Sequence, residues 1–445
     1  MKKACITLLY LSVFYSYGQE KKWSLEDCIH YALHNNINIR QTHLSVKNAE
    51  VEKKTARGVF LPNINANLGH SWNTGLNTNP ISGMNIVSTS QNSIFGVNAN
   101  ITLYDGLKNI TKLHRANLNI LANQYQLEDM KDNISLRIVN AYLQILFNLE
   151  SLKTLKKQIQ LTEKEINQTQ ILIAAGTKPK GEILEINAAI AEQEQQIITA
   201  KNNVMISKIH LTNLMQIENS KNFEILDINY GIPNTSILLN SIEEIYNRSL
   251  KEKDIVKLSQ TTLKIAEDDL KISKGNYLPN LTASYGFGTN YFTSELMTAD
   301  HFLDQLSDNA KHSFSLNLSI PIFNRYLTKN SVKQANIQLE KANLTLKQTK
   351  IDLKDKINQA YNEVQAAQAT FKAAKKSLIA RKNAFGYAKE KFEVGLLNFF
   401  NFNQAKTQYE TTEIGLIKAK YDYIFKTKVL EYYFGVPLYK NEVIQ

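Results

Sequence analysis

The sequence contains little that would interrupt a helix or crosslink the chain. Of its 445 residues, two are cysteine, seven are proline and 17 are glycine. Cys5 lies in a segment that we expect to be removed, so Cys28 remains alone and an internal disulfide framework is excluded. Proline and glycine are absent from residues 107–173 and 327–385. Helices that run through such segments would reach about 90 to 100 Å at 1.5 Å per residue.

Long hydrophobic runs are also missing after the N-terminus. Lys2 and Lys3, the apolar run that follows and Gly18 are typical of a secretory signal peptide at residues 1–18. Beyond it, no stretch of about 18 consecutive apolar residues indicates a membrane-spanning helix. We therefore expect an exported chain that is either soluble or inserted in a membrane through β-strands.

Signatures of catalysis and of metal binding are absent. The sequence has no nucleophile elbow, phosphate-binding loop or zinc motif, so we expect no enzyme activity, no cofactor and no metal site. His30 and His34 are spaced i,i+4 and could in principle bind a metal. The corresponding residues of the second repeat described below, Asn247 and Lys251, give no support for such a site.

A net charge of +11 could indicate a nucleic-acid partner. The lysines are instead spread among glutamates along the long helical segments, which is typical of solvated helix faces. Together with the expected signal peptide, this pattern argues against nucleic acid as a partner.

Two halves of the chain share the same plan. The stretch "LPNINANLGHSWN" begins at Leu61 and "LPNLTASYGFGTN" begins at Leu278, 278 − 61 = 217 residues later. Each half is expected to fold as helix, strand, loop, strand, long helix, turn and long helix, with two extra residues in the second half between 292 and 312. The predicted repeats span residues 19–230 and 231–445.

Four segments show the alternation of a β-strand with one polar and one apolar face. They lie at about 62–73, 93–104, 279–292 and 312–323. The apolar face is expected to contact lipid, with Trp72, Tyr291 and Phe292 in an aromatic girdle at the membrane edge. The uncharged polar face is expected to line a water-filled lumen through Asn63, Asn65, Asn67, Asn98, Asn100, Asn280, Thr282, Ser315 and Asn317.

A soluble sheet alternates in the same way, with its apolar face inward. The strand length of about 10 residues, which suits an outer membrane, favours the membrane interpretation. Four strands cannot close a barrel, and open edges are costly in lipid, so the barrel would be shared between chains. Two chains would give eight strands with a filled interior, whereas three would give twelve with room for a pore.

The long helical segments carry apolar residues at a 3-4 spacing, which is typical of a helical seam. Ala141, Ile145 and Leu152 belong to this pattern in the first half, and Ala360 and Val364 in the second. An ordinary dimeric coiled coil would show the same spacing.

Each long helix is expected to turn back at a glycine, Gly176 in the first half and Gly395 in the second. Glycine takes the left-handed conformation that ends a helix without steric cost. The apolar residues Leu396, Leu397, Phe399 and Phe400 beside Gly395 are expected to be exposed and indicate a contact surface.

Several motifs together resemble those of the TolC-like outer membrane efflux protein family over essentially the whole chain that follows the signal peptide. They are "SLEDCIHYALHNN" at Ser24, "LPNI" at Leu61, "LPNL" at Leu278, "LYDG" at Leu103, "PIFN" at Pro321 and "VGLLNF" at Val394. The "LYDG" and "PIFN" motifs follow the second strand of each half. The first lacks the family's proline, and the second has Asn324 in place of aspartate. The order of the motifs is repeated in the two halves, and this repeated order is more specific for the family than any one motif.

The resemblance implies a mainly α fold with transmembrane β-structure. Long antiparallel helical hairpins would form an α-barrel, and four strands per chain would enter a shared twelve-stranded β-barrel. It also implies a homotrimer in the outer membrane of a Gram-negative bacterium, in contact with outer membrane lipid. A periplasmic adaptor would dock at the hairpin tips and link the trimer to an inner membrane pump. The tip residues are Gly176, Thr177, Lys178, Val394, Gly395, Leu396 and Leu397.

The function expected from this resemblance is an exit duct of a tripartite efflux system, which conducts small molecules passively. One alternative is the exit duct of a type I protein secretion system. A second is a soluble exported coiled-coil protein with a structural or adaptor role.

Overall fold

The structure is a computed structural model that describes residues 22–79, 81–218, 222–227, 231 and 235–438. The expected signal peptide at 1–18 lies outside the described residues, as does the boundary between the two predicted repeats at residue 230. Within the described part of the chain, no helix combines the length and the apolar character needed to span a membrane.

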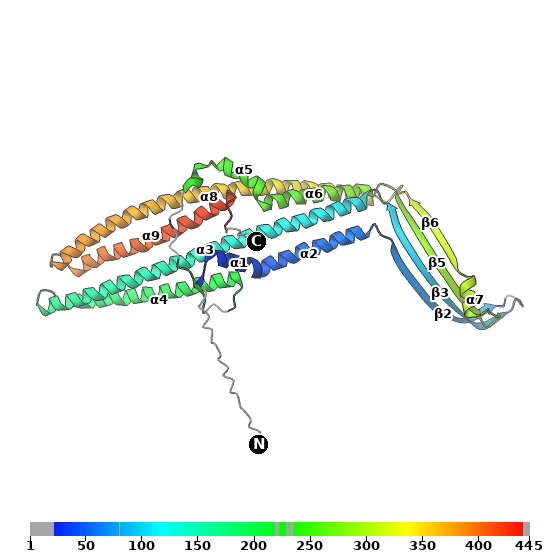
Figure 1. Ribbon diagram of the computed structural model, residues 1–445, viewed down its shortest axis with the longest axis horizontal. Helices are drawn as coiled ribbons and strands as arrows, with labels where there is room; N and C mark the ends of the chain where they lie inside the picture. Colours follow the sequence, from blue (N-terminus) through cyan, green and yellow to red (C-terminus); the bar gives the residue numbers. More distant parts are fainter. Residues whose placement is uncertain (1–21, 80, 219–221, 228–230, 232–234, 439–445) are drawn as a thin grey trace, which may run out of the picture. The chain divides into compact units, whose positions relative to one another are not determined.

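The helices of the two halves match in length. Helices α1 (Leu25–Asn35) and α5 (Ile242–Glu252) have 11 residues each, and α2 (Ile37–Gly58) and α6 (Asp254–Gly275) have 22 each. Helices α3 (Lys108–Ala174) and α8 (Leu327–Glu393) have 67 each, and α4 (Gly181–Met215) and α9 (Phe399–Tyr433) have 35 each. Each of these helices in the first half thus has a counterpart of equal length in the second, as expected for an internal duplication, and Figure 1 labels both sets.

The same capping arrangement opens each half. Ser24 accepts a hydrogen bond from the Asp27 backbone N–H at 3.0 Å, and the Asp27 carboxylate accepts one from the Ser24 backbone. Ser241 and Glu244 make the equivalent pair before α5, at 3.2 and 2.8 Å. Each reciprocal pair satisfies two N–H groups that the first turn leaves without helical partners.

The compact units of the fold do not coincide with the two repeats. One unit, mainly helical, contains the residues up to Arg40, Met130–Glu252 and the residues from Leu353 onward. The other, which holds the main sheet, contains Gln41–Asp129 and Lys253–Asp352. Each unit takes residues from both repeats, and α3 and α8 contribute to both units.

A short parallel sheet lies in the helical unit. It pairs β1 (Lys22–Trp23) with β4 (Glu224–Ile225), and the 3-10 helix η1 (Thr235–Leu239) follows. The buried hydroxyl of Tyr142, on α3, donates hydrogen bonds to the carbonyl oxygens of Trp23 and Leu226 at 3.3 and 3.1 Å. Buried apolar residues of this unit include Ile29, Ile138, Ile145, Leu211 and Ile245.

The main sheet is antiparallel with strand order β2-β3-β5-β6. Strands β2 (Asn63–Thr78) and β3 (Asn85–Tyr104) extend beyond the ranges expected from the sequence. Strand β5 is Asn280–Ser294, and β6, Lys311–Ser319, ends before Pro321. Proline lacks the N–H group that a ladder needs, which accounts for this earlier end.

The connection between β5 and β6 is more elaborate than the loop expected from the sequence. Residues 79–84 link β2 to β3, whereas residues 295–310 link β5 to β6 and include helix α7 (Phe302–Asp308). At this end of the sheet the two halves therefore differ in secondary structure, and not only by two inserted residues in a loop. This difference arises because β2 and β3 continue as strands where the second half forms a helix.

The turn from β3 into α3 explains the "LYDG" motif. The Asp105 carboxylate accepts a hydrogen bond from the Asn109 backbone N–H at 2.9 Å and so caps the first turn of α3. Gly106 has a φ of +73°, and a Cβ atom there would lie 2.5 Å from the Gly275 carbonyl oxygen. Only glycine fits this close approach of two backbones.

Candidate functional site

The register of the main sheet places all the residues predicted to line a lumen on one face. Asn63 pairs with Asn100, Asn100 with Ser284, and Ser284 with Ser315, so these four residues form one rung across the sheet. The Ser284 and Ser315 hydroxyl oxygens are 2.6 Å apart. The other residues predicted for this face have the same parity, namely Asn65, Asn67, Asn98, Asn280, Thr282 and Asn317.

The opposite face of the sheet is apolar, and its side chains are exposed along β2 and β6. Leu68, for example, is 74% exposed. The same applies to Ile64, Trp72, Phe314, Leu316 and Leu318. A soluble sheet would bury such a face, since each large apolar side chain taken out of water stabilises the fold by about 1.5 to 3 kcal/mol.

The three aromatic residues predicted for the membrane girdle do not share a face. Trp72 packs edge-on against His70 with ring centroids 4.0 Å apart, and Tyr291 packs against Phe302 at 5.0 Å, both on the apolar face. Phe292 pairs with Asn92 and therefore lies on the polar face. Tyr291 and Phe292 are consecutive, and consecutive strand residues point to opposite faces.

Two histidines on the apolar face are paired with hydroxyl groups. His70 Nδ1 lies 2.7 Å from Ser93 Oγ, and His312 Nδ1 lies 2.7 Å from Tyr285 Oη. Pairing lowers the cost of placing polar groups on a face that avoids water. His70 stands out in the sequence as the polar residue of an apolar face, but its partner could not be identified without the register.

One charged residue belongs to the four strands. Lys311 begins β6 opposite Gly288 and has the parity of the polar face. The sequence-based range of that strand began at 312, and the polar face was expected to be uncharged. The strand starts one residue earlier and brings an ammonium group to this face.

Both hairpin tips use the same turn. Gly176 and Gly395 each have a φ of +76°. The Thr177 N–H donates to the Leu172 carbonyl oxygen at 2.9 Å, and the Leu396 N–H donates to the Lys391 carbonyl oxygen at 2.8 Å. These bonds from the residue after a left-handed glycine define the Schellman motif. The expected left-handed glycines are therefore present at both tips.

The apolar residues at the second tip divide into outward and inward groups. Leu396 is 76% exposed, and Val394 and Phe400 are also exposed. Leu397 and Phe399 turn inward and pack in a cluster with Ile186, Phe392 and Phe402. The sequence placed Leu397 and Phe399 on the exposed surface, whereas the structure buries Phe399 and gives both side chains a packing role.

Lys178 of the first tip also points inward. Its side chain is 6% exposed, with its Nζ atom 3.1 Å from Glu182 Oε2. The same Nζ atom lies 3.1 Å from the centroid of the Phe392 ring, which belongs to the second hairpin. A cation over an aromatic face is attracted by the ring quadrupole. Lys178 therefore joins the two hairpins, while Gly176 and Thr177 remain exposed.

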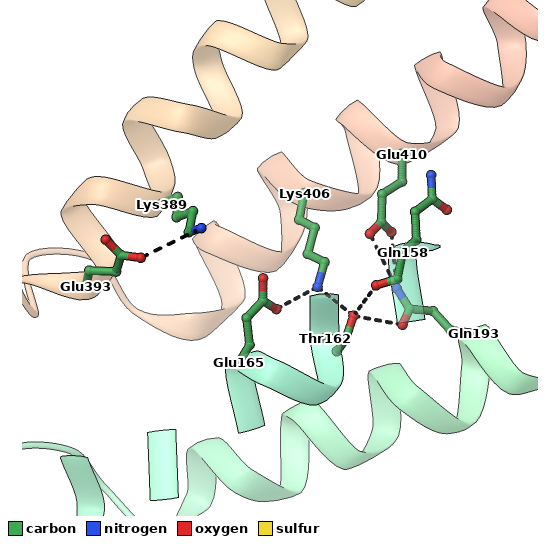
Figure 2. Close-up of polar contacts among 8 residues, drawn as sticks. All are labelled: Gln158, Thr162, Glu165, Gln193, Lys389, Glu393, Lys406 and Glu410. Atoms are coloured by element: carbon green, nitrogen blue, oxygen red, sulfur yellow. Dashed lines mark hydrogen bonds and ion pairs between the residues drawn. The ribbon is translucent and has the colours of Figure 1, made fainter. Parts of the chain in front are cut away.

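A polar cluster links the hairpins farther along the helices (Figure 2). Lys406 of α9 is 3% exposed, and its Nζ atom donates to Thr162 Oγ1 and to Glu165 Oε2 of α3, both at 2.6 Å. Thr162 donates to Gln193 Oε1 of α4 at 2.8 Å. The Gln193 amide nitrogen lies 3.3 Å from a carboxylate oxygen of Glu410, on α9. The cluster thus connects α3, α4 and α9.

The cluster changes the acidity of two side chains. Burial raises the pKa of Glu410 above its usual value, although Lys406 and the hydrogen bond from Gln193 oppose this shift. Burial also raises the pKa of Tyr409, and the negative charge of Glu413 adds to that effect. Burial therefore disfavours the charged form of the Glu410 carboxylate.

Sequence reasoning did not identify Lys406. The available signal is its position four residues after Phe402, which places both side chains on one face of α9. Phe402 is fully buried, so a lysine on the same face needs partners. Those partners come from the other half of the chain and cannot be found from spacing.

The histidine pair considered in the sequence does not form a larger cluster. His30 and His34 are both exposed on α1. In the part of the chain that the structure describes, no three His, Cys, Asp or Glu residues gather where they could hold a metal ion.

The family model of outer membrane efflux proteins matches residues 28–215 and 245–433, one segment in each half. The chain belongs to this family. It is therefore an outer membrane efflux protein of a Gram-negative bacterium, with a large periplasmic helical portion. This assignment confirms the resemblance seen in the sequence and favours the efflux protein over the soluble coiled-coil alternative.

Individual relatives of this outer membrane efflux protein are distant. TolC of Salmonella enteritidis is 20% identical over 310 residues, which are 68% of this chain and 61% of TolC, less than two thirds of that relative. BepC, an outer membrane efflux protein of Brucella suis, is 19% identical over 90% of this chain and 82% of its own length. The CmeC outer membrane channel of Campylobacter jejuni superposes with a TM-score of 0.76 at 17% identity, covering 94% of this chain and 87% of CmeC. This superposition shows a shared fold.

Proposed function

We propose that three copies of the chain form a passive exit duct, in which their sheets close into one β-barrel around water. The observation that carries this proposal is the exposed apolar face of a sheet whose other face is polar. Strands β2 and β6 are the two edges of this sheet. Lipid would cover the apolar face, and neighbouring copies would pair the edges, because unpaired backbone groups are costly in lipid.

Barrel size favours three copies over two. Two copies would give eight strands, whose interior side chains fill the barrel. Twelve strands spaced about 4.8 Å apart and tilted by about 40° form a barrel whose backbone-to-backbone diameter is about 24 Å. Such a barrel leaves room for a pore lined by the Asn, Ser and Thr side chains of the polar face.

The height of the apolar face supports its contact with a membrane. Its apolar rungs run from Leu281, paired with Leu318, to Tyr291, paired with Ser93. Ten residues at about 3.3 Å each, tilted by about 40°, span about 25 Å, which is the height of the apolar band of outer membrane barrels. Trp72 and Tyr291 would mark the outer edge of this band, while Phe292 belongs to the lumen.

The hairpin tips are the proposed docking surface for a helical periplasmic adaptor. Val394, Leu396 and Phe400 offer exposed apolar contacts, and Gly176 and Thr177 offer an exposed backbone turn. Lys178 and Leu397 would support this surface from beneath. An inner membrane pump would act through the adaptor and supply the energy for efflux of small molecules.

The experiment that tests this function places one arginine on either face of the same strand. Ile64 lies on the apolar face near the middle of the proposed membrane band, and Asn65 follows it on the polar face. Arginine at the bilayer midplane of a barrel costs about 2 to 4 kcal/mol on the lipid face, while lumen substitutions are tolerated. Ile64→Arg should therefore reduce the heat-modifiable oligomer in outer membrane fractions strongly, and Asn65→Arg should leave it near the wild-type amount. Equal assembly of both variants would refute the assignment of faces.

A further inference from the structure

Two neighbouring apolar side chains interrupt the polar face of the main sheet, some distance along β3 from Ile86, which lies on the same face opposite Asn77. Ile94 is 53% exposed and Phe292 is 43% exposed. Ile94 pairs with Asn290, and Phe292 pairs with Asn92 one rung farther along, so the two lie diagonally on adjacent strands. Diagonal neighbours on one face are about 7 to 8 Å apart. They form a small apolar patch among asparagine, serine and glycine residues.

The cationic side chain of Lys311 lies on the same face, near this patch. Lys311 pairs with Gly288, Gly288 with Gly96 and Gly96 with Asn67, so the two residues of this rung nearest to Lys311 have no side chain. The surface of the sheet next to Lys311 therefore carries no side chain at Gly288 or Gly96. Lys311 lies one rung from Ile94 and two rungs, about 13 Å along the strand, from Phe292. Within the described residues no carboxylate forms an ion pair with it.

Helix α7 fixes the backbone that carries Phe292. Strand β6 pairs with β5 only as far as Gly288, so the backbone of β5 beyond that point has no strand partner on this side. The Gln305 side chain accepts from the Phe292 N–H at 2.9 Å and donates to the Phe292 carbonyl oxygen at 3.0 Å. Asn309 donates to the Asn290 carbonyl oxygen at 2.7 Å. The side-chain amides replace a strand and hold Phe292 in place.

From this arrangement we infer that Ile94, Phe292 and Lys311 form a contact site for amphipathic organic anions in the outer part of the pore. The apolar patch receives a ring or alkyl group, and the ammonium group attracts a carboxylate or sulfonate. This inference rests on the proposed function, since it takes the polar face as the lumen. A trimer would carry three such sites, each open to the lumen, which suits brief contact with a solute that must leave.

The experiment uses cysteine protection on the full-length protein in outer membranes. Asn290→Cys places a thiol beside the patch, and Asn317→Cys places one three rungs away from Lys311 on the same face. The native Cys28 is buried and gives little background. Labelling rates with an uncharged, membrane-impermeant polyethylene glycol maleimide are measured with naphthalenesulfonate, with naphthyltrimethylammonium and with methanesulfonate. The first is an aromatic anion, the second an aromatic cation and the third an anion without a ring.

Naphthalenesulfonate should slow labelling of Asn290→Cys at least threefold, and the other two solutes should slow it less than half as much. Lys311→Met should remove the difference between the two aromatic ions. Phe292→Ser should remove the protection by naphthalenesulfonate. Asn317→Cys should react at the same rate with every solute.

Two negative results separate the site from the duct. If Asn317→Cys reacts but no solute changes the labelling of Asn290→Cys, the anion site is refuted and the lumen stands. If neither cysteine reacts in the assembled protein, the polar face does not line a water-filled pore, and both proposals fail.

Discussion

The Nζ atom of Lys406 lies 2.6 Å from Glu165 Oε2, and this contact joins α9 of the second half to α3 of the first. Both side chains are largely buried. A buried ion pair adds little net stability, because each charge loses its hydration, but the loss of one partner leaves the other charge uncompensated. The pair therefore fixes how the hairpins align more than it stabilises the fold.

Removal of the lysine alone should be costly. Lys406→Met leaves the Glu165 carboxylate without its cation and should lower the free energy of unfolding by roughly 3 to 5 kcal/mol. The double variant Lys406→Met with Glu165→Leu should recover most of this loss, because both charges are gone. Thermal unfolding followed by helical circular dichroism measures both. A double variant as unstable as the single one would show that the charges are not the cause.

The charge of Glu410 should make stability depend on pH. Because burial raises its pKa in the folded state, this group favours folding fully below its unfolded value near 4.5 and loses that contribution as pH rises through the folded value. Glu410→Gln keeps a partner for Gln193 and removes the charge. The variant should melt at a higher temperature than wild type at pH 7, with the difference disappearing towards pH 4. A difference that grows in acid would contradict this explanation.

Much of the fold could be predicted from the sequence because the signals are local and repeated. The doubled "LPN" segments, the two glycine turns and the alternation of Ile64 with Asn65 each follow from neighbouring residues. The residues at which the strands begin and end were harder to predict from the sequence. The limit of β6 depends on its pairing with β5, and α7 has no strong periodic pattern.

The site was harder to predict because its important contacts join distant residues. Lys178 was expected at an exposed tip, yet it packs on Phe392, 214 residues away (392 − 178). Phe292 was assigned to lipid by its aromatic character, whereas its parity places it with Asn92. The aromatic side chain of Phe292 suggested the membrane edge, but the alternation of side chains along the strand decides on which face it lies.

The exposed leucine at the second tip should be needed for docking and not for assembly. Leu396→Glu places a charge where an apolar adaptor contact is proposed and should abolish efflux, while the amount of heat-modifiable oligomer stays unchanged. Leu396→Met preserves the apolar surface and should retain efflux. Drug tolerance of cells that carry each variant provides the measurement. Normal tolerance with Leu396→Glu would count against docking at this tip.

Two glycines of α8 and its turn should respond to alanine in opposite directions. Gly395 has a φ of +76°, which an alanine reaches at a cost of about 1 to 2 kcal/mol, so Gly395→Ala should destabilise the helical unit. Gly386 lies inside the helix, and a Cβ atom there would meet nothing within 4 Å. Gly386→Ala should stabilise by about 0.5 to 1 kcal/mol. Chemical denaturation of both variants tests the pair, and a loss of stability in both would show that Gly386 packs against another chain.

The number of chains in the assembled protein tests the shared barrel most directly. Native mass spectrometry of the protein extracted from outer membranes in detergent should give the mass of three chains. A single chain that stays soluble in aqueous buffer, with Ile64 and Leu316 covered by its own helices, would contradict the proposed duct.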